Sequence, residues 1–164
     1  MNKTVTSAAQ LLAAGRRLAE LRFVAGSDGN LSLRTADNSI LITPSGAHKG
    51  QLQEAELLSV DTAGTVLSGP GKPSSEMQMH LYAYKQRPDI GACVHSHPPY
   101  VTAHAVSGVA LEPDILPEVV VFVGPIALTE FAPPGTPAVG KSLEPFIADH
   151  NAFVLRNHGL LTIG

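Results

Sequence analysis

Histidine spacing is the feature of this chain that most clearly points to chemistry. His95 and His97 stand two positions apart in a stretch, 90–97, that we predict to be a β-strand. Side chains alternate between the faces of a strand, so both imidazoles would point the same way and one metal ion could bind them. His158, in a predicted turn between two apolar runs, is a candidate third ligand. Three neutral imidazoles with an open fourth position are typical of a catalytic zinc site. The alternative is that the three histidines are hydrogen-bonded separately, and spacing alone leaves both interpretations open.

Three short segments of small residues are candidate anion-binding sites. They are Gly29-Asn30, Ser45-Gly46 and Ser74-Ser75. The first two lie at the ends of predicted strands, where backbone N–H groups are free to form an anion-binding concavity. The third begins a predicted helix, and the N-terminus of a helix attracts phosphate. Glu76 stands beside it. The simpler interpretation is two ordinary turns and a favourable helix start, in which Glu76 only complements the helix dipole.

The elements that would position these residues can be predicted from hydrophobic periodicity and from turn residues. Helices are expected over 7–24, 74–87, 100–106 and 142–148. Strands are expected over 31–34, 40–42, 57–60, 65–67, 90–97, 118–123, 126–129, 152–155 and 160–161. The proline-rich stretch 132–137 is expected to be a loop. This strand-rich order predicts an α/β protein with a mixed, mainly antiparallel sheet covered by helices.

Composition limits the classes of function. The chain has 164 residues and 44% hydrophobic residues, which predicts one domain over 1–164 with a real core. The formal charge of −3 and the absence of any Lys/Arg run argue against nucleic acid or an anionic membrane surface as partner. The single cysteine, Cys93, excludes an internal disulfide framework. The first residues have no pattern of a secretory signal, and the longest apolar run, 119–123, is too short to span a bilayer, so we expect a cytoplasmic protein.

Five short motifs follow one another along the chain: Asp28-Gly29-Asn30-Leu31-Ser32, Ile42-Thr43-Pro44-Ser45-Gly46, Pro73-Ser74-Ser75-Glu76, His95-Ser96-His97-Pro98 and Asn157-His158-Gly159-Leu160. Taken together and in this order, they resemble the class II aldolase/adducin family, and within it the zinc-dependent L-fuculose-1-phosphate aldolases. The resemblance implies a three-layer α/β/α fold with a central, mainly antiparallel sheet. It also implies a homotetramer with its active site at the subunit boundary.

The resemblance further implies a role for each matching residue. His95, His97 and His158 are expected to bind Zn²⁺, or another divalent transition metal, and Glu76 to be the catalytic acid/base. The expected phosphate-binding residues are Gly29, Asn30, Ser45, Gly46, Ser74 and Ser75. The expected reaction is the cleavage of a phosphorylated ketose, such as L-fuculose 1-phosphate, to dihydroxyacetone phosphate and an aldehyde.

Two departures from the family pattern affect these expectations. Fuculose-phosphate aldolases have a tyrosine soon after the metal-binding strand, where this chain has Glu118. They also continue past the third histidine into closing helices, which we expect this chain, ending at Gly164, to lack. Rival activities on the same scaffold are a sugar-phosphate 4-epimerase, a decarboxylase and a methylthioribulose-phosphate dehydratase. Family epimerases typically have Asp after the paired serines, so Glu76 favours the aldolase over the epimerase. A non-catalytic adducin-like interaction module is a further alternative, but adducin-type domains lack the complete histidine set.

Overall fold

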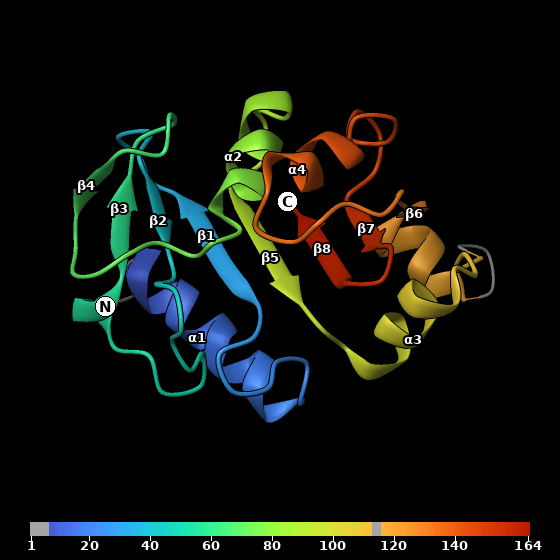
Figure 1. The fold of residues 1–164 in the computed structure, drawn as a ribbon, viewed down its shortest axis with the longest axis horizontal. Helices are drawn as coiled ribbons and strands as arrows, with labels where there is room; N and C mark the ends of the chain where they lie inside the picture. Colours follow the sequence, from blue (N-terminus) through green and yellow to red (C-terminus); the bar gives the residue numbers. More distant parts are fainter. Residues whose placement is uncertain (1–6, 113–115) are drawn as a thin grey trace.

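An eight-stranded sheet forms the centre of the computed structural model, which describes residues 7–112 and 116–164 (Figure 1). The strand order is β4-β3-β2-β1-β5-β8-β7-β6. All neighbouring strands are antiparallel except β6 and β7, which are parallel. The strands are β1 (Asn30–Arg34), β2 (Ile40–Ile42), β3 (Leu58–Val60), β4 (Val66–Ser68), β5 (Ala92–Ser96), β6 (Ile126–Leu128), β7 (Ala152–Leu155) and β8 (Gly159–Ile163). The mainly antiparallel sheet predicted from the sequence is therefore confirmed.

Helices cover both faces of this sheet. They are α1 (Ser7–Glu20), α2 (Met77–Gln86), α3 (Pro99–Ser107) and α4 (Pro137–Ser142), with a 3₁₀-helix η1 (Glu54–Glu56) and a π-helix η2 (Val119–Val123). Helix α1 packs on β1, α2 packs against α4, and α3 contacts β7 and β8. None of the helices in the described ranges is long and apolar enough to cross a membrane.

The residues of strand β1 alternate between the two faces of the sheet. Leu31 and Leu33 belong to the hydrophobic cluster under α1. Between them, Ser32 points to the other face, where its hydroxyl contacts His80 and Tyr84 of α2. Alternation with a period of two thus puts a leucine layer on one side of the sheet and a polar contact on the other.

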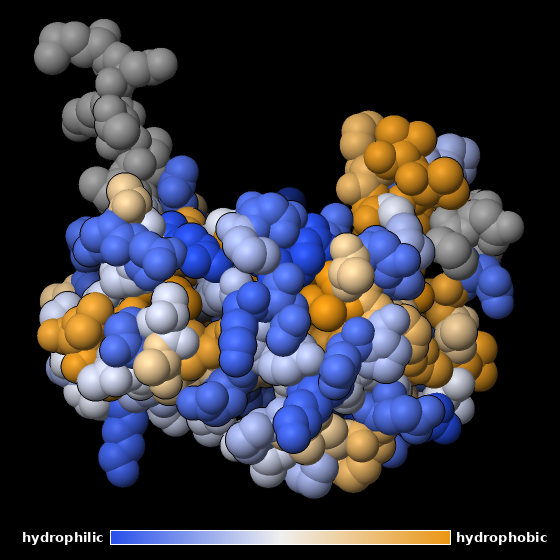
Figure 2. All heavy atoms as spheres, turned by 90° about the horizontal axis from the view of Figure 1, so that it is seen from above, coloured by the Kyte–Doolittle hydropathy of each residue, from blue (hydrophilic) through white to orange (hydrophobic). Residues whose placement is uncertain are grey.

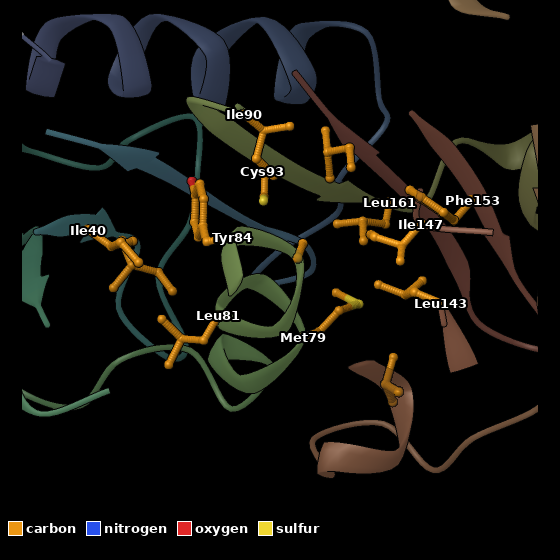
Figure 3. Packing of buried hydrophobic residues seen from close by; sticks show 14 of the residues in the cluster. Ile40, Met79, Leu81, Tyr84, Ile90, Cys93, Leu143, Ile147, Phe153 and Leu161 are labelled. Carbon is orange, nitrogen blue, oxygen red and sulfur yellow. The ribbon is translucent and has the colours of Figure 1, made fainter. Parts of the chain in front are cut away.

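The larger core lies between the sheet and α2, with α4 and the turns after it completing the layer (Figure 3). Met79 and Tyr84 of α2 point at the sheet, and Leu143 and Ile147 approach it from the segment after α4. Phe153 of β7 is fully buried in this layer. Because β5 and β8 form the floor of the core, the strand that carries His95 is held in place by packing along its length.

Two elements predicted in the C-terminal half of the chain differ from those in the structure. The run 118–123, predicted to be a strand, contains the π-helix η2 over Val119–Val123, and no strand of the described chain pairs with it. A short, continuous apolar run has no period that separates a strand from a helix, and this one faces solvent rather than a core. The helix predicted over 142–148 instead runs over Pro137–Ser142 and is followed by turns. Pro137 occupies the first helical turn, where its fixed φ is suited to a helix start.

The start of α2 also differs, and it matters for the site. The helix begins at Met77, with Glu76 as its N-cap residue, rather than at Ser74. Ser74 and Ser75 form the turn before it, and the Ser74 hydroxyl accepts a hydrogen bond from the Glu76 N–H at 3.2 Å. The glutamate therefore projects from the junction between the turn and the helix.

Candidate active site

The three histidines singled out in the sequence meet at one end of the central strands. His95 lies in β5, His97 directly follows that strand, and His158 lies in the turn between β7 and β8. Strand β8 inserts between β5 and β7, and its pairing with β5 brings the turn beside the first two rings. One ligand atom from each of the three residues lies within 4.8 Å of the others. The spacing required for a shared cation is thus present.

Hydrogen bonds fix how these rings present their nitrogens. His95 Nδ1 lies 2.9 Å from the carbonyl oxygen of Leu160, and because a carbonyl oxygen can only accept, Nδ1 carries the proton. In the neutral ring, His95 Nε2 then has a free lone pair, and it faces His97 Nε2 at 3.1 Å. Burial lowers the pKa of His158 to about 4, with His95 adding to the effect and Glu76 opposing it. Burial likewise lowers the pKa of His97. Neutral imidazoles are the form that binds metal.

Glu76 closes one side of the histidine cluster. Its Oε2 lies 3.2 Å from His95 Nε2, and its Oε1 lies 3.2 Å from His158 Nε2. Burial acts to raise the pKa of Glu76, but the contacts with His95 and His158 and the hydrogen bond from Asn30 outweigh it and lower the pKa to about 2. Among the described residues, Oε1 is buried and has no hydrogen-bond donor. Lone pairs of nitrogen and oxygen therefore converge with few protons between them, which is the environment that a divalent cation fits.

The side chain of Asn30, which was expected to bind phosphate, is hydrogen-bonded to Glu76 and His80 instead. Its Nδ2 donates to Glu76 Oε2 at 2.9 Å, and its Oδ1 lies 2.6 Å from Nε2 of His80. His80 in turn lies 2.6 Å from the hydroxyl of Ser32, which is 2.9 Å from the hydroxyl of Tyr84. Since Asn30 Oδ1 can only accept, His80 Nε2 carries the proton. A buried chain of hydrogen bonds thus fixes the amide that holds the carboxylate.

His80 is a residue that the sequence reasoning did not connect with the site. It is fully buried. Burial, with His95 adding to the effect and Glu76 opposing it, lowers its pKa to about 3. The available signal was its position four residues after Glu76, one helical turn further along the same face. That spacing could have suggested a supporting partner.

A cavity of about 460 Å³ opens beside Glu76. It is lined by Ser27, Asp28, Gly29, Asn30, Pro44, Ser45, Gly46, Lys49, Ser74, Ser75, Glu76, His97, Pro134, Gly135 and His158. All six residues that were expected to bind phosphate are in this lining. Glu118, in contrast, is exposed before η2 and is not part of it.

The loops around this cavity use glycine for a reason that the geometry makes clear. Gly29 has φ of +70°, and a Cβ placed there would lie 2.7 Å from both the His95 carbonyl oxygen and a Val24 methyl group. No side chain fits in that space. The loop that carries Asn30 can therefore approach the end of β5 only because the residue before it is glycine.

Fewer backbone N–H groups in the cavity are free to bind an anion than the sequence suggested. The N–H of Ser45 donates to the Lys72 carbonyl at 2.9 Å, and the N–H of Ser74 donates to Thr43 at 3.2 Å. Within the described ranges, the N–H groups of Gly46 and Ser75 have no recorded protein acceptor, and the Ser75 side chain is exposed. These two amides, with the hydroxyls of Ser45 and Ser75, remain available to an anion.

Comparison with known proteins identifies the class to which this fold and site belong. The model for the class II aldolase and adducin N-terminal domain matches residues 9–164, so the chain belongs to the class II aldolase and adducin family. The L-fuculose phosphate aldolase of Methanococcus vannielii is 36% identical over 147 residues, covering 90% of this chain and 78% of that protein. The 3-oxo-tetronate 4-phosphate decarboxylase of Haemophilus influenzae is 36% identical over 155 residues, covering 92% and 73%.

A solved structure shows that the fold is also that of this family. An L-fuculose 1-phosphate aldolase superposes with a TM-score of 0.89 at 31% identity, over 97% of this chain and 76% of that one. The resemblance to this family that the sequence motifs suggested is confirmed. Relatives of equal identity carry two different activities, so the family assignment by itself does not select the reaction.

Proposed function

We propose that this protein is a metal-dependent lyase of phosphorylated sugars, and specifically an aldolase. Its reaction is the cleavage of a ketose 1-phosphate of the L-fuculose type into dihydroxyacetone phosphate and an aldehyde. The observation that carries the proposal is the position of Glu76, between the three-histidine cluster and a cavity lined by small-residue loops. The fuculose phosphate aldolase relatives support it.

His95, His97 and His158 would hold the metal. Three imidazole nitrogens suit zinc, and they also suit other divalent transition metals. A cation bound there would supply Lewis-acid polarisation of the substrate carbonyl. The protein's own part is to orient the rings, which the hydrogen bond from His95 Nδ1 to the Leu160 carbonyl oxygen supports.

Glu76 would move the proton. In the cleavage, a substrate hydroxyl loses its proton and the adjacent carbon–carbon bond breaks, with its electrons moving towards the carbonyl. The carbon that has lost the aldehyde then takes up a proton. An ionised carboxylate can accept the hydroxyl proton and return it to that carbon, which balances the reaction. The lowered pKa of Glu76 keeps it ionised before substrate arrives.

The loops opposite Glu76 would bind the phosphoryl group. The amides of Gly46 and Ser75 and the nearby serine hydroxyls are the available donors. Holding the phosphate at one end of the cavity fixes the reacting carbons at the other, and such positioning supplies a large part of many catalytic effects.

Decarboxylation of a 3-oxo-tetronate 4-phosphate is the second candidate, favoured by the relatives with that activity. Loss of carbon dioxide needs no deprotonated hydroxyl, but it also leaves a carbon next to a carbonyl that must take up a proton. In the aldol cleavage Glu76 would return the hydroxyl proton, whereas in the decarboxylation the proton would have to come from water, with Glu76 passing it on. The two activities differ in the group that leaves, and the same residues serve the shared step.

An assay of the zinc-loaded protein with both substrates tests the proposal. We expect L-fuculose 1-phosphate to yield dihydroxyacetone phosphate, measured with a coupled reductase, and elemental analysis to find one metal per chain. Release of carbon dioxide from 3-oxo-tetronate 4-phosphate, without cleavage of the ketose phosphate, would replace the aldolase by the decarboxylase. Absence of both activities in a metal-loaded protein would favour the adducin-like interaction module.

We also propose that the protein assembles with copies of itself, as the family resemblance implies. An apolar surface at η2 supports this. Val120, Val121 and Phe122 are 54%, 71% and 82% exposed, and Leu116 is 55% exposed. Figure 2 shows hydrophobic atoms projecting on the side of the molecule that carries α3 and β6. A group of neighbouring large apolar residues that are this exposed typically marks an interaction surface.

A further inference from the structure

Lys49 is a buried cation at the edge of the candidate active site. The residue is 2% exposed, although lysine is among the residues that are least often buried. Its ammonium group donates to the carbonyl oxygens of Ser27 at 2.5 Å and Ala47 at 2.7 Å. These carbonyls belong to the two loops that carry Gly29 and Gly46, so one ammonium joins both loops of the expected phosphate site.

The charge of Lys49 has no ionic partner within the described ranges. No carboxylate there lies within 4.0 Å of its Nζ. Burial lowers the pKa of Lys49 to about 8, while the more distant charges of Asp28 and Glu76 act to raise it. Buried charges are normally paired, because removing an ion from water costs several kcal/mol that carbonyl dipoles only partly offset. The buried ammonium of Lys49 therefore lacks the anion that would normally balance its charge, and it lies beside a cavity that could admit one.

Among the residues that the structure describes, Lys49 is also the only lysine or arginine in the lining of the cavity. The rest of that lining supplies backbone amides and hydroxyls, and its charged side chains are otherwise Asp28 and Glu76. A phosphate dianion entering this cavity would meet two carboxylates and neutral donors. Of the side chains in this lining, Lys49 is therefore the one that carries a fixed positive charge for the anion.

We propose that Lys49 is the cationic residue of the phosphoryl-binding site, placing its ammonium behind the two loops so that a substrate phosphate completes its ion pair. This inference rests on the proposed function, because it assigns the charge that selects phosphorylated substrates for the same cavity. It adds a residue that no sequence motif of the chain had indicated. Two of the three ammonium hydrogens are used by the loops, and the third is available to the anion.

The test measures the affinity of the zinc-loaded protein for inorganic phosphate by calorimetry. Lys49→Met removes both the charge and the donors, whereas Lys49→Gln removes the charge and keeps an N–H donor for the loops. If the ammonium acts on the anion, both variants should bind phosphate about 10- to 100-fold more weakly, as expected for a lost hydrogen bond to a charged group. Should Lys49→Met fail to fold, Lys49→Gln decides the question.

A matched control distinguishes the loss of this buried charge from a change in the net charge of the protein. Lys72 is exposed and lies outside the cavity lining, and its backbone carbonyl accepts a hydrogen bond from the N–H of Ser45 in one of the two loops. Lys72→Gln should leave the affinity for phosphate within about twofold of wild type, because exposed charges contribute little. An equal loss in Lys72→Gln and Lys49→Gln would overturn the proposal.

Two further outcomes are distinguishable. If Lys49→Gln folds, keeps its zinc and binds phosphate as tightly as wild type, Lys49 only joins the loops, and the proposal is wrong while the aldolase assignment stands. If the wild-type protein with zinc bound shows no affinity for phosphate, the proposal fails together with the assignment of a phosphorylated substrate.

Discussion

At the scale of single residues, the candidate site depends on how one carboxylate is held. Glu76 contacts two histidine rings and receives a hydrogen bond from Asn30, whose own orientation is fixed by His80. Each contact restricts the glutamate to one position, and a proton-transfer group must be placed within a few tenths of an ångström of its target. A substitution that keeps the size of the side chain can therefore test its proposed role in catalysis.

Replacing Glu76 with glutamine removes the ionisable group and keeps its size. We expect turnover to fall by about 10²–10⁴-fold, the usual loss for a general acid/base, while zinc content and phosphate affinity are retained. Steady-state kinetics and elemental analysis measure both. The control is Glu54→Gln, in the exposed turn η1, which should behave as wild type. Unchanged turnover in Glu76→Gln would remove this residue from the mechanism.

Replacing His158 with alanine removes one of three nitrogen donors. We expect the purified variant to retain no zinc after dialysis, because two imidazoles form too few bonds to hold the ion. The exposed His48 provides the control, since His48→Ala should keep the wild-type metal content. A His158→Ala protein that keeps one zinc per chain would contradict the three-histidine site.

At the scale of elements, most of the fold could be predicted and a few regions could not. The strand that carries His95 and the final hairpin follow from alternating or bounded apolar runs, and the structure has both. The predictions for 118–123 and 142–148 were wrong, because short apolar runs near prolines have no distinguishing period. The links from Asn30 to His80 and from Lys49 to two loops join residues far apart in the chain. No local pattern encodes such pairs, so only the structure reveals them.

Helix α2 gives a prediction about stability and pH through His80. Its pKa is about 3 when folded and about 6.5 when unfolded, so below pH 6.5 the unfolded chain binds the additional proton. The free energy of unfolding should thus be unaffected by this group above about pH 6.5. It should fall by up to about 1.4 kcal/mol per pH unit as the pH decreases towards 3.

The variant that tests this is His80→Gln, compared with wild type in urea at several pH values, both with chelator present. Glutamine does not titrate, so the slope of stability against pH between about 6 and 4 should be flatter by close to one proton. The variant should also be less stable at pH 7, since a buried hydrogen-bond chain is disturbed. The exposed His48→Gln is the control and should keep the wild-type slope. Equal slopes in wild type and His80→Gln would show that His80 is not held neutral by burial.

At the scale of the whole molecule, the apolar surface at η2 predicts assembly. Phe122 is 82% exposed there, and Phe122→Ser should weaken association by removing a large apolar contact, with a lower mass in light scattering at the same protein concentration. Leu67, 58% exposed in β4 near the opposite end of the sheet, gives the control, since Leu67→Ser should leave the mass unchanged. A wild-type protein that is monomeric at all concentrations would contradict the proposal.

The insertion of β8 between β5 and β7 has a consequence for how the protein is made. On the ribosome, β1, β2 and β5 are synthesised long before β8, so the nascent chain exposes one edge of β5 until the last hairpin arrives. His95 and His97 lie along and just beyond that open edge, two of the three candidate ligands without the third. An unpaired edge is also where chains join wrongly. On the proposed function, the metal would therefore be acquired after the hairpin has docked, and zinc bound by a nascent chain would report that the strand pairing most distant in sequence, β5 with β8, is complete.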